Sequence, residues 1–147
     1  MNKNGKTAAK GRRQVGALPY KVVENNGVEV MLVTSRETKR WIIPKGWPMP
    51  GMTLAEAAAQ EAFEEAGVRG PVDPQPLGDF RHEKNVGPAD IEVRIVVHAM
   101  SVEQELVDYP EARSRERRWF SIAEAVEAVG SAKLGRLIAQ SAERARS

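Results

Sequence analysis

One uninterrupted helical segment, residues 53–66, lies between stretches with strand character, and this arrangement restricts the fold more than any other feature of the sequence. Thr53 and Glu56 have the spacing of a capping box, and no glycine or proline interrupts the run. Gly67 is placed to end the helix. The sequence therefore predicts a helix enclosed by strands, which favours an α+β fold over an all-α or all-β one.

Strand signals occur on both sides of this helix. Two β-branched runs flank Asn25-Asn26-Gly27, which is a strong hairpin signal, and residues 40–46 predict a short extended piece. In residues 91–98, apolar side chains at every second position predict a central strand with one buried face. A shorter strand is expected within 76–84, separated from the central strand by a turn at 85–90, and another within 117–120.

Two further helices are expected near the C-terminus. Ser121 and Glu124 repeat the capping-box spacing, and the apolar run that follows reaches Gly130. Residues 132–145 form the third predicted helix.

The basic residues are unevenly distributed. Residues 1–16 contain only basic charges, whereas the remaining chain has 17 basic and 20 acidic residues. The sequence pI of about 9.0 is therefore a property of the N-terminus. We interpret residues 1–16 as a flexible basic arm and residues 17–147 as a single domain, and we do not expect nucleic acid as the partner.

The chain contains no cysteine, which excludes disulfides, zinc-thiolate sites and a catalytic thiol. No apolar run approaches the ~20 residues of a membrane span, and the N-terminus lacks the apolar stretch of a secretory signal. We therefore expect a cytoplasmic protein that does not associate with membranes.

Three carboxylates share one face of the predicted central helix. At 100° per residue, Glu61, Glu64 and Glu65 fall within an arc of about 100°, and no Lys or Arg of that helix lies on this face. Like charges at these spacings repel, and a desolvated carboxylate without a partner is costly. Two interpretations remain: an ordinary solvated acidic face, or a site for a hard cation such as Mg²⁺, Mn²⁺ or Ca²⁺.

The residues around this face resemble the Nudix box, G-x5-E-x7-R-E-U-x-E-E-x-G-U, in which U is an aliphatic residue. The positions that match across residues 46–68 are Gly46, Glu61, Ala62, Glu64, Glu65, Gly67 and Val68. Together with "RWIIPKG" and "RRWFSIAEAVEAV", the box resembles the diphosphoinositol polyphosphate phosphohydrolase branch of the Nudix hydrolases and its bacterial relatives, over most of residues 17–138. This resemblance implies a mixed β-sheet between α-helices, an α/β/α arrangement.

The resemblance also implies a reaction and a set of site residues. Nudix hydrolases cleave a diphosphate linked to a further moiety and use Mg²⁺ or Mn²⁺ as cofactor. By this resemblance Glu61, Glu64 and Glu65 are the catalytic and metal-binding residues, and Glu61 is also a candidate general base. Gly46 allows its loop to approach the metal, with its backbone carbonyl as a candidate ligand.

Two positions depart from the box. Met52 stands where the pattern has a glutamate, and Gln60 stands where it has an arginine that orients the neighbouring glutamates. An amide donates hydrogen bonds but supplies no charge. Since these departures leave the general base open, three acids outside the box are further candidates: Glu103, Glu105 and Glu116.

Basic residues near the box suggest the kind of substrate. Two groups are expected to border the acidic helix and to bind phosphate groups: Arg36, Lys39, Arg40 and Lys45 in one, and Arg81 and Lys84 in the other. They favour a polyphosphorylated small molecule, such as a diphosphoinositol polyphosphate or a dinucleoside polyphosphate. For each of these residues taken alone, ordinary exposed charge is the simpler interpretation.

Other functions remain open from the sequence. The chain could be a non-catalytic module of the same fold that binds a ligand or nucleic acid, or a hydrolase of sugar nucleotides or oxidised nucleotides. Retention of all three helix glutamates favours an enzyme, because a binding module has no chemical need for a costly acidic face.

Overall fold

The computed structural model describes the backbone of residues 12–86 and 89–146, and the side chains of that part of the chain except at 26, 84–90 and 146. Residues 1–11, most of the predicted arm, lie outside it. Among the described residues, no helix is long and apolar enough to cross a membrane.

One large mixed sheet forms the centre of the molecule. Its strand order is β3-β2-β1-β7-β6, with β4 also paired to β1 and β9 to β2. The bounds of these strands are β1 Arg13–Val23, β2 Gly27–Thr34, β3 Trp41–Ile42, β4 Lys45–Gly46, β6 Gly78–Val86, β7 Ala89–Ser101 and β9 Arg117–Ser121. A second, two-stranded sheet joins β5 (Val68–Arg69) to β8 (Gln104–Glu105).

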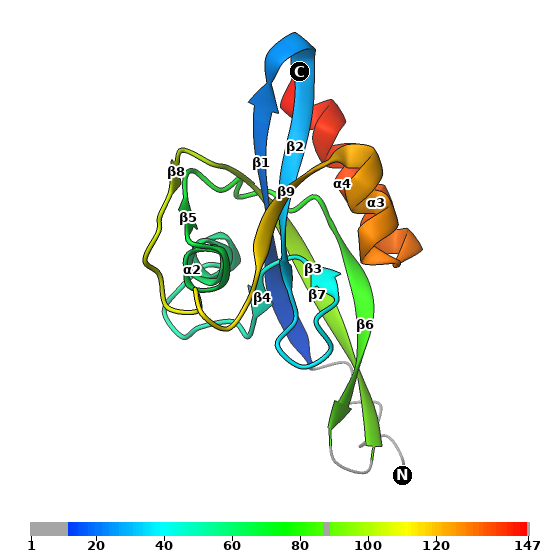
Figure 1. Cartoon of the computed structure of the whole chain (residues 1–147). Helices are drawn as coiled ribbons and strands as arrows, with labels where there is room; N and C mark the ends of the chain where they lie inside the picture. The colour runs from blue at the N-terminus through cyan, green and yellow to red at the C-terminus, as the bar shows by residue number, and fades with distance from the viewer. Residues whose placement is uncertain (1–11, 87–88, 147) are drawn as a thin grey trace.

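Three α-helices cover the two faces of the large sheet. α2 (Leu54–Ala66) lies on one side, and α3 (Ile122–Val129) and α4 (Ala132–Arg146) lie on the other (Figure 1). A short 3-10 helix, η1 (Glu24–Asn26), joins β1 to β2. This arrangement confirms the predicted α+β class and its mixed sheet between helices.

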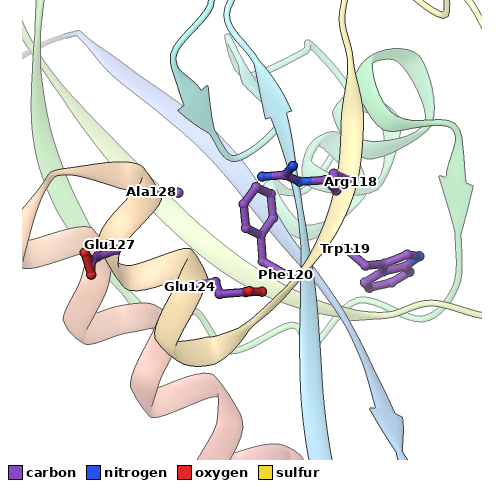
Figure 2. A pocket seen from close by; sticks show the side chains of 6 residues that line it. All are labelled: Arg118, Trp119, Phe120, Glu124, Glu127 and Ala128. Atoms are coloured by element: carbon purple, nitrogen blue, oxygen red, sulfur yellow. The ribbon is translucent and has the colours of Figure 1, made fainter.

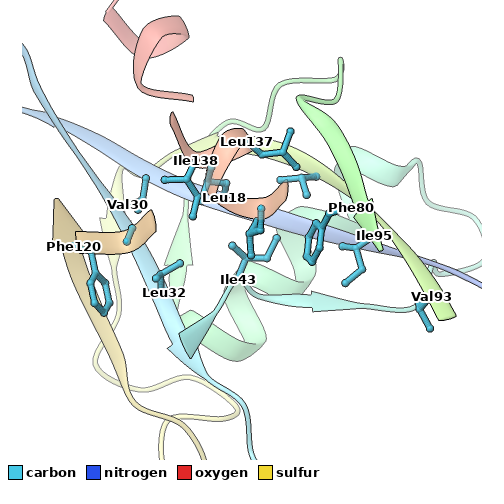
Figure 3. Close-up of a cluster of buried hydrophobic side chains, with 13 residues drawn as sticks. Leu18, Val30, Leu32, Ile43, Phe80, Val93, Ile95, Phe120, Leu137 and Ile138 are labelled. Carbon is cyan, nitrogen blue, oxygen red and sulfur yellow. The ribbon is translucent and has the colours of Figure 1, made fainter. Parts of the chain in front are cut away.

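The core on the α3/α4 side consists of large apolar side chains (Figure 3). It contains Leu18, Val30, Leu32, Ile43, Phe80, Ile95, Leu134, Leu137 and Ile138 among others. On the α2 side, Val15, Ala17, Met31 and Val33 of the sheet meet the small side chains of Ala57, Ala58, Ala62 and Ala66. The two faces of one sheet are therefore packed by residues of different size.

Local signals in the sequence predicted the helices well. Thr53 and Glu56 form both hydrogen bonds of a capping box at the start of α2, and Gly67 ends that helix with φ of 65°. Ser121 and Glu124 form the same box at α3. The predicted hairpin also forms, with β1 and β2 paired antiparallel.

Two expectations about strands were wrong. β1 begins at Arg13, so residues 13–16, predicted to belong to the arm, are part of the sheet, and Val15 is fully buried. The run of basic residues at the N-terminus made the start of this strand look like part of the arm. The single buried face predicted for the central strand holds over residues 91–94, where Glu92 and Arg94 are exposed, but from Ile95 onward β7 is buried on both faces, because Val96 and His98 are buried as well. Of the predicted turn at 85–90, residues 87–88 lie outside the described residues.

Candidate metal centre

Helix α2 brings the predicted carboxylates to the edge of the core. Glu61 is 7% exposed and Glu65 is 5% exposed, whereas Glu64 is half-buried. The alanines on the inner side of α2 let its backbone approach the sheet, so carboxylates next to that stripe are drawn out of water. The simple interpretation of a solvated acidic face therefore does not hold for Glu61 and Glu65.

Gly46 lies directly against the Glu61 carboxylate. β4, which contains Gly46, is paired with β1 through Val15. A Cβ atom added at Gly46 would lie 2.3 Å from the Glu61 carboxylate, closer than any side chain tolerates. The absence of a side chain at this position therefore creates the space that the carboxylate occupies.

Burial and mutual repulsion disfavour charge on the Glu61 carboxylate. Its pKa is raised from 4.5 to about 8, first by desolvation, then by its hydrogen bond with Glu65 and by the charges of Glu65, Glu64 and Glu111. The pKa of Glu65 is also raised by burial, against the lowering effects of Arg115, of the hydrogen bond with Glu61 and of Lys45. Since the two carboxyl groups share a hydrogen bond, the pair holds a proton at a pH where an exposed glutamate is ionised.

Glu65 has two protein partners. The backbone N–H of Lys45 donates to its Oε1 at 3.2 Å, and Nη2 of Arg115 lies 3.6 Å from its Oε2. No local pattern pointed to this arginine, because Arg115 lies 50 residues beyond Glu65 in the chain. The helix itself supplies no basic residue, so Glu65 takes its basic partner from a distant part of the chain.

Glu111 is a second residue that the sequence did not identify. The backbone N–H of Glu111 donates to the carbonyl of Glu64 at 2.9 Å, which ties the turn at 110–114 to α2. Its carboxylate accepts a hydrogen bond from Nε of Arg115 at 2.6 Å and adds to the charge that raises the pKa of Glu61.

The three acids proposed as alternatives outside the box have other surroundings. The carboxylate of Glu105 accepts a hydrogen bond from Nε1 of Trp119 at 3.1 Å. Glu116 is exposed and its backbone N–H is bonded to Oγ1 of Thr34, and Glu103 is also exposed.

The donor set suits a hard divalent cation. Carboxylate oxygens beside a glycine that leaves room at the backbone are ligands that Mg²⁺ and Mn²⁺ prefer. Within residues 12–86 and 89–146, however, no three acidic, imidazole or thiol side chains converge into a ready-made metal site. Glu64 accepts a hydrogen bond from Nε2 of Gln60 at 2.7 Å, while Glu65 is bound by Lys45 and Arg115.

The predicted phosphate-binding residues are dispersed. Arg36, Lys39 and Arg40 are exposed in the turn between β2 and β3, which starts next to Thr34. Lys45 adjoins Gly46, and its charge lowers the pKa of Glu65. Arg81 is 69% exposed and forms a 2.8 Å ion pair with Glu92 of β7, so it is already partnered. The side chain of Lys84 lies outside the described residues.

A cavity of about 570 Å³ lies elsewhere, between β9 and α3 (Figure 2). Its lining consists of Arg118, Trp119, Phe120, Glu124, Glu127 and Ala128. The Arg118 guanidinium lies over the rings of Phe120 and Trp41, at 4.4 and 4.9 Å from their centroids. None of these residues is on α2 or β4, so this cavity and the carboxylates are separate features.

Comparison with known proteins connects this geometry to a family. The NUDIX domain family matches residues 12–140. Nudix hydrolase 12, mitochondrial, of Arabidopsis thaliana is 34% identical over 128 residues, which cover 76% of this chain and 63% of that protein. Diphosphoinositol polyphosphate phosphohydrolase 3-beta of Bos taurus is 36% identical over 102 residues, covering 67% of this chain and 58% of that protein.

Solved structures share the fold at lower identity. A C. elegans Ap4A hydrolase is 18% identical with a TM-score of 0.61, covering 86% of this chain and 92% of that one. The NUDIX domain of Shewanella oneidensis NrtR complexed with ADP ribose is 16% identical with a TM-score of 0.67, covering 90% and 87%. At this identity the likeness concerns the fold alone.

The chain spans only part of its curated relatives, since it covers 63%, 64% and 58% of the Arabidopsis proteins named Nudix hydrolase 12, 13 and 4. The match over residues 12–140 nevertheless includes the sheet, α2 with its carboxylates, and α3. The chain therefore belongs to the NUDIX domain family.

Proposed function

We propose that this protein is a divalent-metal-dependent hydrolase that cleaves a diphosphate linkage in a polyphosphorylated small molecule, of the diphosphoinositol polyphosphate or dinucleoside polyphosphate type. The observation that carries the proposal is the pair of buried carboxylates, Glu61 and Glu65, packed against Gly46. Burying two neighbouring acids costs stability, so a role in binding a cation explains why both are present.

Mg²⁺ or Mn²⁺ is the proposed cofactor, held by Glu61, Glu64 and Glu65 with the carbonyl of Gly46. Each carboxylate oxygen has a second lone pair, so its hydrogen bonds to Gln60, Lys45 or Arg115 leave acceptor capacity. When bound, such an ion polarises phosphate oxygens, lowers the pKa of a bound water and neutralises developing charge.

The residues of the chain supply a proton acceptor and its support. Glu61 is the proposed general base, because its carboxylate lies against Gly46, at the edge of the candidate metal centre. The Lys45 N–H orients Glu65, which in turn shares a hydrogen bond with Glu61.

The substrate class rests on cations and on similarity. Exposed Arg36, Lys39 and Arg40 follow the end of β2, and Lys45 precedes Gly46, so we propose this group for phosphate binding. Arg81 and Lys84 are the second proposed group, and Arg81 would have to exchange its pairing with Glu92 for a phosphate. The names of the bovine and nematode proteins, a diphosphoinositol polyphosphate phosphohydrolase and an Ap4A hydrolase, suggest the same two substrate types.

The test is product release from a panel of diphosphoinositol polyphosphates, diadenosine polyphosphates, nucleoside triphosphates and sugar nucleotides, with Mg²⁺ or Mn²⁺. The wild-type protein should hydrolyse one class of substrate, and this hydrolysis should require the metal ion. Glu65→Gln should lower turnover roughly a hundredfold to a thousandfold, the range for losing one group that stabilises charge in a transition state. Its melting temperature in chelator is measured alongside, because the change removes one of two neighbouring buried acids but also a charge partner of the buried Arg115.

Glu24→Gln, at the exposed hairpin turn, is the matched control and should retain wild-type rates. If wild type binds Mn²⁺ but hydrolyses nothing in the panel, a ligand-binding module becomes the better proposal. The predicted cytoplasmic location stays a prediction, to be checked by fractionation of the source cells.

A further inference from the structure

Arg115 contacts three separate parts of the structure through one guanidinium group. Its Nη2 lies 3.6 Å from Oε2 of Glu65, its Nε donates to Oε1 of Glu111 at 2.6 Å, and its Nη1 donates to the carbonyl of Thr34 at 3.1 Å. The Arg115 side chain is only 11% exposed. α2, the end of β2 and the turn at 110–114 therefore meet at one cation.

The buried carboxylates need such a cation because α2 does not contain one. Gln60, one turn before Glu64, is bonded to Glu64 through an uncharged amide. The last turn of α2 contains no basic residue. Compensating charge at Glu65 therefore comes from outside the helix, and Lys45 and Arg115 are the residues whose charge acts on it.

We propose that Arg115 is a positioning residue, whose guanidinium fixes the Glu65 carboxylate in the candidate metal centre from the segment before β9, in place of a cation on α2 itself. This inference rests on the function proposed above. A guanidinium suits the task because its planar fork holds several acceptors in fixed directions, which an ammonium group does not. The bond to Thr34 fixes the guanidinium itself, so Glu65 is oriented relative to the sheet.

A purely structural role is the competing explanation. On that view, Arg115 only ties the turn at 110–114 to β2, and Glu65 is an incidental neighbour. The two explanations differ in one measurable property, the affinity of the folded protein for a divalent ion. A tie between the turn and β2 changes the melting temperature, whereas a residue that orients a ligand changes metal affinity as well.

The experiment measures Mn²⁺ affinity by electron paramagnetic resonance, with kcat and KM on the substrate found by the panel. Arg115→Gln should weaken Mn²⁺ binding roughly 10- to 100-fold, the usual effect of removing a residue that orients a metal ligand. The kcat should fall while KM changes little, since the lost interaction concerns the reacting centre. Arg113→Gln removes the same charge from an exposed site two residues away and should behave as wild type.

A second substitution distinguishes the orientation of Glu65 from the tie between the turn at 110–114 and β2. Gln60→Arg places a cation on α2, so in the Arg115→Gln background it should recover most of the lost Mn²⁺ affinity without recovering the melting temperature. In the wild-type background the same change should raise Mn²⁺ affinity less than it does in Arg115→Gln, because Arg115 already performs the role. Arg115→Lys keeps the charge but not the planar fork, so it should show an intermediate loss of Mn²⁺ affinity. This variant replaces Arg115→Gln in the test if Arg115→Gln does not fold.

The outcomes distinguish this inference from the function on which it rests. If wild type binds Mn²⁺ and hydrolyses substrate but Arg115→Gln matches its affinity and kcat, the positioning role is wrong and the function stands. Recovery of affinity and melting temperature together by Gln60→Arg would also contradict it. If wild type neither binds Mn²⁺ nor hydrolyses any substrate, both are overturned.

Discussion

The two faces of the central sheet differ in what they bury. On the α3/α4 face, helix residues such as Leu134 and Ile138 pack in one cluster with Leu18, Leu32 and Phe80, and no acid is among the described residues buried there. On the α2 face, the helix contributes alanines to the core and buries the acids Glu61 and Glu65 beside them.

This difference indicates a division of labour within one small domain. Large aliphatic and aromatic side chains remove more apolar surface from water for each residue, so the α3/α4 face stabilises the fold more strongly. Alanines bury less but allow α2 to approach the sheet closely, which brings Glu61 against the backbone of Gly46. We infer that stability is concentrated on the first face and chemistry on the second.

Truncating a large side chain on the α3/α4 face should have the largest effect on stability. Leu134 is 1% exposed, and Leu134→Ala should lower the free energy of unfolding by about 2–5 kcal/mol through lost burial and a cavity. Chemical denaturation measures this change. Mn²⁺ affinity of the folded protein should be unaffected.

Val107→Ala is the control, because Val107 is 86% exposed and its truncation should change stability by less than about 0.5 kcal/mol. A loss of Mn²⁺ affinity in folded Leu134→Ala protein would show that the two faces are coupled and not separate.

The parts of the fold that the sequence predicted depend on near neighbours. Capping boxes, the glycine that ends α2 and the Asn-Gly hairpin signal are set by residues within a few positions, so they are readable without the tertiary structure. The start of β1 at Arg13 is not, because residues 13–16 become a strand only by pairing with β7 and β4. Those partners lie far along the chain.

The candidate site shows the same limit. Glu61, Glu64 and Glu65 are close in sequence and could be identified together, along with Gly46 from the box. Arg115 and Glu111 reach α2 only through the path of the chain after β8, and no local pattern marks them. The sequence also could not show which basic residues already have a partner. Arg81, predicted to bind phosphate, is paired with Glu92 across the β6–β7 ribbon.

A side chain at Gly46 should disturb the α2 face specifically. In Gly46→Ala, the new Cβ would overlap the Glu61 carboxylate, so we expect a loss of about 1–3 kcal/mol, typical of overpacking, together with reduced Mn²⁺ affinity. Denaturation and Mn²⁺ titration measure the two effects.

Gly135→Ala is the matched control on the other face. Its Cβ would lie 3.2 Å from Val126, a tight contact that lowers stability. Alanine is favoured over glycine in a helix by about 0.5–1 kcal/mol, which offsets this loss. Stability should therefore change little, and Mn²⁺ affinity should not change. Equal losses of Mn²⁺ affinity in the two variants would mean that Gly46 has no special relation to Glu61.

A more gradual effect is expected from the α2 face, where metal-free stability should depend on pH. Desolvation, followed by the neighbouring carboxylates, raises the pKa of Glu61 to about 8 from 4.5, so the folded protein holds a proton that the unfolded chain releases. This contribution to stability is fully present below pH 4.5 and is lost as the pH rises through about 8. In chelator, stability should therefore fall over this window, by at most about 1.4 kcal/mol for each pH unit from one group.

Glu61→Gln isolates this contribution, because the amide does not titrate while the other groups of the protein still do. The difference in unfolding free energy between variant and wild type, measured by denaturation at several pH values, should grow in favour of the variant as pH rises. The charges of Arg115 and Lys45 lower the pKa of Glu65 and so oppose its rise by burial. Glu65 therefore adds less to the pH dependence of stability. A difference that stays constant from pH 5 to 8 would mean that Glu61 is ionised throughout this range, and the buried pair would then need a permanent counter-charge even without metal.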